Sequence, residues 1–377
     1  MKKLSTALKL EYTLFTDSRL EELENEAREI LLKGEAEGAV MSLSGGIDSS
    51  VMFHIMKKFN INITDVFFNK AVEPIENQKK LKKYVKHFKN IHRAETRSYK
   101  SIIKEYGFPI ANKNFSQLCY RLKSMPLSIN NIVDKYRIVT GVSPYDVVTG
   151  VSPYNLDKKK TRNNYSLEPK YWYLALNYPI QSKCCDILKK QPAKKVNKPM
   201  IIGIMADDSL ARRRAINSAY HGKFFPLQSW KKQDIFMYAK QEKIDVSEAY
   251  LDKWLNEDIK IIGATNTGCV GCHFGQEQNH FIEVKGVRIN IKKFDKLELL
   301  RPKTYDYYMN MKCQGYTFKE VIKAFEDSRD GKYIEESIKL RNKYIDDILE
   351  LLPHAVHKKT GKKVPIEAYD LIMSMKL

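Results

Sequence analysis

The stretch Ala39-Val-Met-Ser-Leu-Ser-Gly-Gly-Ile-Asp-Ser-Ser-Val-Met-Phe53 decides the fold of this chain. Its first apolar run predicts a strand, the polar segment in the middle predicts a turn, and the second apolar run predicts the start of a helix. Two adjacent glycines let the backbone turn tightly and bring its N–H groups close to an anion, while Ser44 and Ser49 add hydroxyl donors. Because a helix N-terminus favours negative charge, the stretch predicts a phosphate-binding turn that holds a nucleotide.

The string Ser44-Gly45-Gly46-Ile47-Asp48-Ser49 resembles the signature of the PP-loop ATP pyrophosphatases. A Walker loop would require Gly-x-x-x-x-Gly-Lys-Ser/Thr, which this sequence lacks. The resemblance implies that the turn binds ATP with Mg²⁺ and that the enzyme cleaves between the α and β phosphates. It also implies that five residues bind the phosphates: Ser44, Gly45, Gly46, Asp48 and Ser49. Two of them, Asp48 and Ser49, are in addition implied to be catalytic. The residues alone also allow an ordinary strand-to-helix turn capped by Asp48 or Ser49.

Four of the six cysteines form two pairs. Cys184 and Cys185 are adjacent, whereas Cys269 and Cys272 form a Cys-x-x-Cys motif among glycines. Four thiolates can bind zinc or an iron–sulfur cluster. Adjacent cysteines reach different irons of a wide cluster more readily than one small zinc ion, so we expect a [4Fe–4S] cluster in preference to zinc. The alternative is a pair of buried cysteines and a separate redox pair.

The order Cys-Cys followed by Cys-x-x-Cys closely resembles the cluster motif of the phosphoadenosine-phosphosulfate/adenylyl-sulfate reductase family. That family is a branch of the PP-loop superfamily. Two segments between the motifs also resemble it: Ile201–Ser209, which is followed by two arginines, and Phe225–Ile235. The likeness extends from about Val40 to Phe281 and is much weaker outside that range.

The resemblance implies further site residues. Asp208, which stands where the family usually has glutamate, contacts the nucleotide together with Asn69 and Arg213, and Arg212 is catalytic. Arginine forks would neutralise phosphate or sulfate, and Asp208 with Ser209 could cap a helix. The alternative interpretation of these arginines is a solvated basic helix.

One departure from the family concerns the C-terminal tail. Members that reduce the phosphosulfate use a cysteine within Glu-Cys-Gly-x-His, and this sequence has no such motif. Cys313 lies in Met311-Lys-Cys-Gln-Gly-Tyr316, which lacks both the glutamate and the histidine. Direct reduction of a sulfonucleotide through the usual thiosulfonate is therefore in doubt.

The predicted elements follow in the order strand, turn, helix, strand. This order predicts an α/β fold with a doubly wound parallel sheet. The family resemblance implies that this sheet is of the adenine nucleotide alpha-hydrolase-like (PP-loop) type. We expect three regions: a helical lead-in over residues 1–36, a nucleotide-binding domain with the four-cysteine site over residues 37–281, and a helical appendage over residues 282–377. A repeat, Val139–Tyr145 and Val148–Tyr154, predicts successive turns of a loop.

Charge and composition restrict the partners. The formal net charge is +20, with basic clusters scattered along the chain, and such an excess attracts polyanions. We expect contact with DNA or RNA, although the clusters are also compatible with solvated helix faces. No apolar run reaches the roughly 18 residues of a membrane span, and the N-terminus lacks a signal-peptide core, so we expect no membrane contact and a cytoplasmic location.

Three functions remain open on the sequence. The leading hypothesis is an enzyme that cleaves ATP to AMP and pyrophosphate and couples this to sulfur transfer onto nucleic acid, with a sulfur-donor protein. DNA phosphorothioation and tRNA thiolation proteins are the comparisons that the resemblance suggests. The second is reduction of adenylyl sulfate or its 3′-phosphate to sulfite with thioredoxin. The third is a nucleic-acid-binding protein without turnover.

Overall fold

The computed structural model describes residues 4–6, 16–69, 73–93, 97–145, 147, 166–217, 222–274, 276, 280–356, 361 and 363–377. The chain forms two compact units. Unit 1 comprises Met1–Tyr99, Cys185–Cys272 and Gln276–Leu300, and unit 2 comprises Lys100–Cys184, His273–Gly275 and Arg301–Leu377. This division differs from the predicted boundaries after residues 36 and 281, because unit 1 is assembled from separate segments of the chain.

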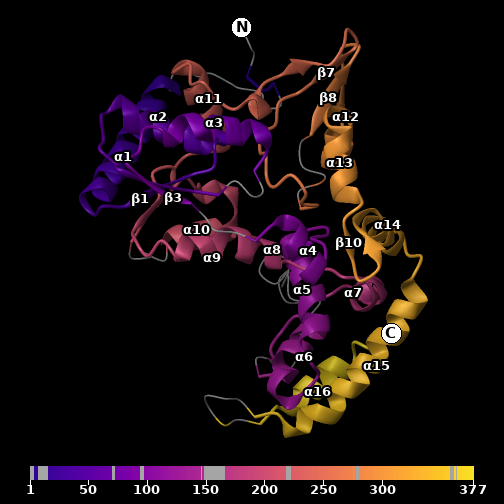
Figure 1. Ribbon diagram of the computed structural model, residues 1–377. Helices are drawn as coiled ribbons and strands as arrows, with labels where there is room; N and C mark the ends of the chain where they lie inside the picture. Colours follow the sequence, from indigo (N-terminus) through magenta and orange to yellow (C-terminus); the bar gives the residue numbers. More distant parts are fainter. Residues whose placement is uncertain are drawn as a thin grey trace. The chain divides into compact units, whose positions relative to one another are not determined.

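The centre of unit 1 is a five-stranded parallel sheet in the order β3-β2-β1-β4-β5 (Figure 1). Its central strand pairs on both sides, with Met41 opposite Val66 and also opposite Ile201. The bounds are β1 Val40–Leu43, β2 Asp65–Phe68, β3 Asn90–Arg93, β4 Met200–Ile202 and β5 Lys223–Phe224. A parallel sheet with helices along its faces is an α/β fold, as predicted.

Side chains alternate between the two faces of this sheet. Met41 and Leu43 point into the large core, which packs the sheet against α1 Thr16–Ala36, α2 Ile47–Lys58, α3 Ile75–Val85 and α11 Lys232–Gln241. Val40 points to the opposite face, where a smaller apolar cluster packs against Ala193 and Val196. That face is covered by a π-helical turn, η3 Asp186–Lys190, and by α9 Gln191–Lys194.

Shorter elements complete this part of the chain. They are α8 Lys183–Cys185, α10 Leu210–Asn217 and the 3₁₀ turns η4 Ala206–Asp208 and η5 Glu248–Tyr250. The helical lead-in predicted over residues 1–36 contains α1, and the strand and helix predicted from Ala39–Phe53 correspond to β1 and α2.

Unit 1 also contains a four-stranded antiparallel sheet that the sequence did not predict. Its order is β6 Lys253–Trp254, β7 Ile259–Ile261, β8 Phe281–Val284 and β9 Val287–Asn290, and α12 Lys293–Leu300 follows. The expectation of a purely helical region after residue 281 is therefore wrong at its start. Lys285 and Gly286, with φ of +48° and +81°, make the two-residue turn that joins β8 to β9.

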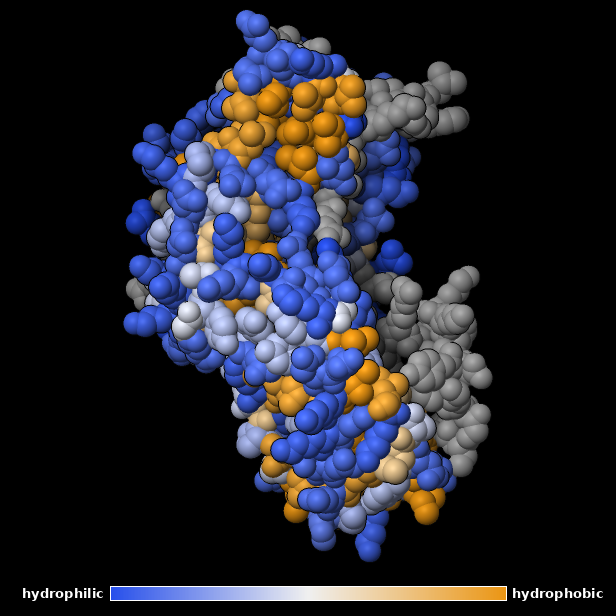
Figure 2. Space-filling view, turned by 90° about the vertical axis from the view of Figure 1, so that its right-hand side faces the viewer, coloured by the Kyte–Doolittle hydropathy of each residue, from blue (hydrophilic) through white to orange (hydrophobic). Residues whose placement is uncertain are grey.

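One face of this smaller sheet is aliphatic and exposed. In the pairing register, Ile282 lies opposite Ile289 and Val284 opposite Val287. Val287 is 64% exposed and Ile289 is 41% exposed. Figure 2 shows a hydrophobic patch in the region of these strands.

Unit 2 is helical, with aromatic packing in its core. Phe108 stacks on Phe318 with ring centroids 4.9 Å apart, and Tyr171 stacks on Phe325 at 5.6 Å. Its longer helices are α4 Tyr99–Tyr106, α5 Lys113–Ser124, α6 Ile132–Thr140, α7 Trp172–Asn177, α13 Pro302–Met309, α14 Phe318–Arg329, α15 Ile334–Leu351 and α16 Ile366–Met373. It also contains β10 Lys312–Cys313, β11 Tyr316–Thr317 and the 3₁₀ turns η1 Ile129–Asn131, η2 Pro169–Tyr171 and η6 Leu352–His354.

The internal repeat begins inside a helix rather than a loop. Val139 and Thr140 end α6, and Gly141, with φ of +84°, terminates it. The second copy, Val148–Tyr154, lies outside the described residues. Across the described part of the chain, no helix combines the length and apolar character needed to cross a membrane.

Candidate functional site

The predicted phosphate turn lies between β1 and α2, at the carboxyl end of the central strand. Gly45 has φ of +74°, and a Cβ atom there would lie 2.1 Å from the carbonyl oxygen of Asn77. Only glycine fits this position without rearrangement. Ser44 Oγ accepts a hydrogen bond from the Gly46 N–H at 3.2 Å, and Ser49 Oγ lies 3.4 Å from Ser44 Oγ. The two predicted hydroxyl donors are therefore neighbours.

The first turn of α2 has no side-chain cap from the residue before it, and the Ile47 backbone lies against the Tyr250 hydroxyl. Gly46 is the N-cap residue, and no side chain of the described residues caps the helix there. Ser49 and Ser50 instead donate to the Gly46 carbonyl oxygen at 2.9 and 3.0 Å. The alternative of a turn capped by Asp48 or Ser49 is thus not what the structure contains. Uncapped N–H groups at a helix start favour a bound anion.

Asp48 makes an ion pair that the sequence did not reveal. Its Oδ1 lies 2.9 Å from the ammonium of Lys232, at the start of α11. Lys232 belongs to the Phe225–Ile235 segment that carries part of the family resemblance. The structure therefore brings the two segments together at the phosphate turn.

Asn77 connects the phosphate turn to the cysteine loop. Its carbonyl oxygen faces Gly45, and its side-chain amide donates to Thr267 Oγ1 at 3.1 Å, two residues before Cys269. The buried Asn77 Oδ1 has no hydrogen-bond partner among the described residues. Tyr250 makes a parallel connection, because its hydroxyl lies 3.3 Å from Thr267 Oγ1 and beside Gly46.

The Cys-x-x-Cys segment forms a tight loop. The Cys272 N–H donates to the Cys269 carbonyl oxygen at 3.3 Å, and Gly268 has φ of +58°. Tyr99 donates its hydroxyl to the Gly271 carbonyl oxygen at 2.6 Å. Lys293, from α12, donates its ammonium to the carbonyl oxygens of Cys269 and, at 2.9 Å, Cys272.

Opposite charges surround the Cys269 thiol. Burial raises the pKa of this thiol, while Lys189 and Lys293 act to lower it. Lys189 forms an ion pair of 3.5 Å with Glu73, and burial raises the pKa of the Glu73 carboxyl. Burial acts to lower the pKa of the Lys189 ammonium. The neighbouring Cys269 and Glu73 outweigh burial and raise this pKa overall, and Cys185 also acts to raise it. Cys185 and Cys269 therefore share one electrostatic environment.

The four predicted metal ligands are divided between the units. Cys185, Cys269 and Cys272 belong to unit 1 and Cys184 to unit 2. All six cysteines are described, and none forms a disulfide. No group of three or more His, Cys, Asp or Glu side chains in the described ranges is arranged to hold a metal ion. The donors have the right chemistry for zinc or a cluster, and the cationic surroundings of Cys269 and Cys272 match an anionic thiolate centre.

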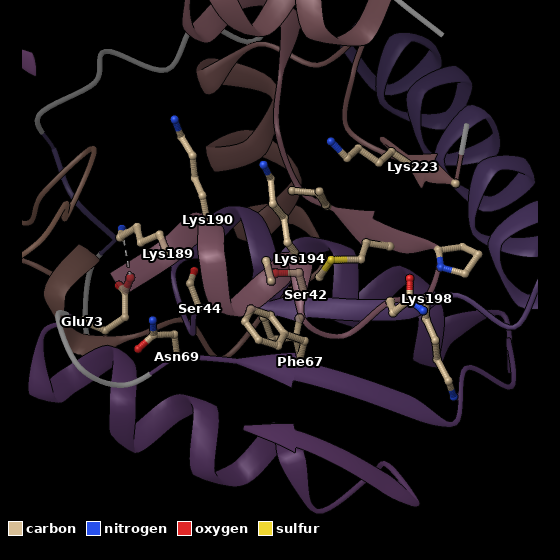
Figure 3. Close-up of a pocket in the computed structure, with 17 residues that line it drawn as sticks. Ser42, Ser44, Phe67, Asn69, Glu73, Lys189, Lys190, Lys194, Lys198 and Lys223 are labelled. Carbon is tan, nitrogen blue, oxygen red and sulfur yellow. Dashed lines mark ion pairs between the residues drawn. The ribbon is translucent and has the colours of Figure 1, made fainter. Parts of the chain in front are cut away.

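A cavity of about 760 Å³ lies over the second face of the parallel sheet. This volume is within the range of ligand-binding pockets. Figure 3 shows Ser44, Asn69, Glu73 and Lys189 at one end and Lys198 and Lys223 at the other. Phe67, Met200 and Ile202 contribute apolar surface between these ends, and Lys190 and Lys194 project from the covering helical segment.

The cavity brings some predicted residues together and leaves others aside. Ser44 and Asn69 line it, and the Asn69 amide donates to the Leu188 carbonyl oxygen. Arg212 and Asp208 are outside its lining and form an ion pair with each other. Arg213 is exposed on α10. Ser209 Oγ accepts from the Arg212 N–H at 3.2 Å, so Ser209 caps α10 as expected.

Several residues at this site carried no signal in the sequence. Asn77, Thr267 and Tyr250 are ordinary polar residues outside any motif, and only the folded chain places them against the phosphate turn. Lys189 lies in a lysine-rich run and could be recognised only by its spacing from Cys185.

A comparison with models of known protein families gives no match, and a comparison with curated protein sequences gives no significant relative.

Proposed function

We propose that this protein is a PP-loop enzyme, related to the phosphoadenosine-phosphosulfate reductase family, that cleaves ATP to AMP and pyrophosphate to drive sulfur transfer onto nucleic acid. One observation carries the proposal. The phosphate turn and the cysteine loop, more than 200 residues apart in sequence, both contact Asn77, and Ser44 of the turn lines one end of a ligand-sized cavity. A nucleotide site and a thiolate site in contact are what such a reaction needs.

The cavity suggests how ATP would bind. Its apolar middle, with Phe67, suits an adenine ring, and the end with Ser44 suits the phosphates. The N–H groups of the turn and of the first turn of α2 would bind the pyrophosphate part, with Mg²⁺ shared between phosphates and protein. Arg212 would give up its ion pair with Asp208 and bind a substrate phosphate instead, and Arg213 would bring a second guanidinium to that phosphate.

The chemistry proceeds by displacement at the α phosphorus. An oxygen of the acceptor attacks this atom, the bond to the β phosphate breaks, and pyrophosphate leaves with the negative charge that the turn stabilises. The adenylated oxygen is then a leaving group: a hydrosulfide ion delivered by a donor protein forms the new bond to the acceptor atom, the bond from that atom to the oxygen breaks, and the oxygen departs as part of AMP. A [4Fe–4S] cluster held by Cys184, Cys185, Cys269 and Cys272 would supply a site for sulfur or electron delivery.

Charge favours nucleic acid as the acceptor. The net charge of +20 exceeds what one nucleotide needs. Lysines line the cavity, and among the described residues of its lining Glu73 is the one carboxylate, already paired with Lys189. A polyanion would therefore be attracted toward the same site.

The test is pyrophosphate release from ATP by protein purified without oxygen, with and without DNA or RNA. We expect release that nucleic acid increases and that Ser49→Ala lowers about a hundredfold. Ser50→Ala is the matched control, because its hydroxyl donates to the same Gly46 carbonyl oxygen but is not the neighbour of Ser44. Its rate should stay within a few-fold of the parent.

The rival functions give different results. Sulfite release from adenylyl sulfate with thioredoxin, and no pyrophosphate from ATP, would establish sulfonucleotide reduction instead. Nucleic-acid binding that persists in the Ser49→Ala variant, with no turnover of either nucleotide by the parent, would establish a binding protein.

A further inference from the structure

Lys293 places an ammonium at the cysteine loop, where backbone carbonyl oxygens accept its hydrogen bonds. Its ammonium donates to the carbonyl oxygens of Cys269 and Cys272, and a Cβ on Gly268 would lie 3.9 Å from Nζ. In the described part of the chain, no carboxylate lies within ion-pair distance of Lys293. Burial lowers the pKa of this lysine, and Cys272 and Cys269 act in the opposite direction.

A partly buried ammonium without a counter-charge is unfavourable. Carbonyl oxygens satisfy its hydrogen-bond donors but leave the net charge uncompensated, and proteins normally pair such charges or place them beside metal centres. The neighbouring Lys189 differs in this respect, because Glu73 already neutralises it. Among the described residues around this loop, Lys293 is therefore an ammonium that no carboxylate neutralises.

The groups of this loop that can become anionic are the sulfurs of Cys269 and Cys272, the two residues whose carbonyl oxygens accept from Lys293. Four thiolates bound to a zinc ion or to a [4Fe–4S] cluster leave a net negative charge on the centre. Lys293 is also well placed to shape the loop, since one ammonium ties together the carbonyls at both ends of the motif. Both effects would favour binding of such a centre.

We infer that Lys293 is a positioning residue that shapes the Cys269–Cys272 loop and supplies the counter-charge of an anionic, thiolate-bound metal centre. The inference rests on the cysteine site of the proposed function, but not on the ATP chemistry. Helix α12 would thus carry the counter-charge of a loop that lies about 20 residues earlier in the chain.

The test compares Lys293→Met, Lys293→Arg and the parent after anaerobic reconstitution with iron and sulfide, and separately with zinc. The measurements are bound metal per chain, the rate of metal loss to a chelator and, for the iron form, the midpoint potential. We expect Lys293→Met to lose metal about tenfold or more faster and to have a lower potential, because a positive charge near the centre is gone. Lys293→Arg should retain most of the parent behaviour.

Lys285→Met is the matched control, because it removes the same charge from the exposed β8–β9 turn of the same unit. Without metal, Lys293→Met should remain folded by circular dichroism, with a melting temperature no lower than that of the parent. Parent protein that binds neither iron nor zinc would overturn the inference. Equal metal retention in Lys293→Met and the parent, or unfolding of the metal-free variant, would also overturn it.

Pyrophosphate release is measured separately. A parent that holds metal in the expected way but releases no pyrophosphate would sink the proposed function and leave the role of Lys293 standing.

Discussion

At the scale of single residues, the phosphate turn depends on how closely two backbones approach. Gly45 meets the carbonyl oxygen of Asn77, and Gly46 meets the Tyr250 hydroxyl. The side chains of Asn77 and Tyr250 in turn contact Thr267 beside the cysteine loop. A substitution in the phosphate turn should therefore also alter the structure of the cysteine loop.

Gly45→Ala should destabilise the protein by more than the cost of a left-handed alanine, which is about 1–2 kcal/mol, because its methyl group would also clash with Asn77. Gly38→Ala is the control. Gly38 has φ of +62°, but nothing lies within 4 Å of a Cβ built there, so only the conformational cost applies. Urea unfolding measures both, and equal losses would contradict the close approach at Gly45.

At the scale of elements, the amino end of the parallel sheet is held by one buried carboxylate. Asp65, the first residue of β2, accepts from Asn90 and His92 of β3 and from Lys198 just before β4. Burial raises the pKa of the Asp65 carboxyl, but these donors outweigh it and hold the value well below its usual range. The carboxylate thus ties β2 to its neighbour β3 and to the segment that leads into β4, which lies beyond β1 in the sheet.

This network predicts a pH dependence of stability. A carboxyl whose pKa is lower in the folded than in the unfolded state, where it is about 3.9, stabilises the protein fully above about pH 5 and progressively less as the pH falls. Asp65→Asn should therefore cost about 2 kcal/mol at pH 6 and clearly less at pH 3. Denaturant titrations at both pH values measure this, with the exposed Glu257→Gln as control. A loss independent of pH would refute the role of the charge.

The elements also show what a sequence can predict. Long periodic segments and the strand–turn–helix around Gly45 appear where expected, because their signals are local. The four-stranded sheet was missed because β6 to β9 have two to four residues each, too few for a periodic signal. The hairpin turn at Lys285 and Gly286 was the one available clue.

At the scale of the whole molecule, the two units could not be predicted as continuous ranges of the sequence. Unit 1 recruits strand β4 from beyond residue 185, after a long segment that belongs to unit 2. Motif spacing predicted the phosphate turn and the cysteine pairs, but their connection through Asn77 is a product of folding. Such contacts between ordinary polar residues have no pattern in a single sequence.

The net charge of the whole chain leads to a salt-dependent prediction. Affinity for a single-stranded nucleic acid of about 20 nucleotides should fall about tenfold or more between 50 and 200 mM salt, through release of counterions from the phosphates. Fluorescence anisotropy measures this, with an uncharged peptide nucleic acid of the same bases as control. Affinity that does not respond to salt would show that the basic clusters are only solvated surface.

The order of the strands has a consequence for the newly made chain. Strand β1 needs β4 on one side, yet about 100 residues separate the end of β3 at Arg93 from the start of β4 at Met200. Counted from the end of β1 at Leu43, about 160 residues must be made before Met200, so at a synthesis rate of about 5–20 residues per second one edge of β1 stays without its partner for roughly 8–30 s. Pairing over such a distance also slows folding. Fragments that stop before residue 200 should therefore aggregate through this open edge, and the protein should depend on chaperones during synthesis.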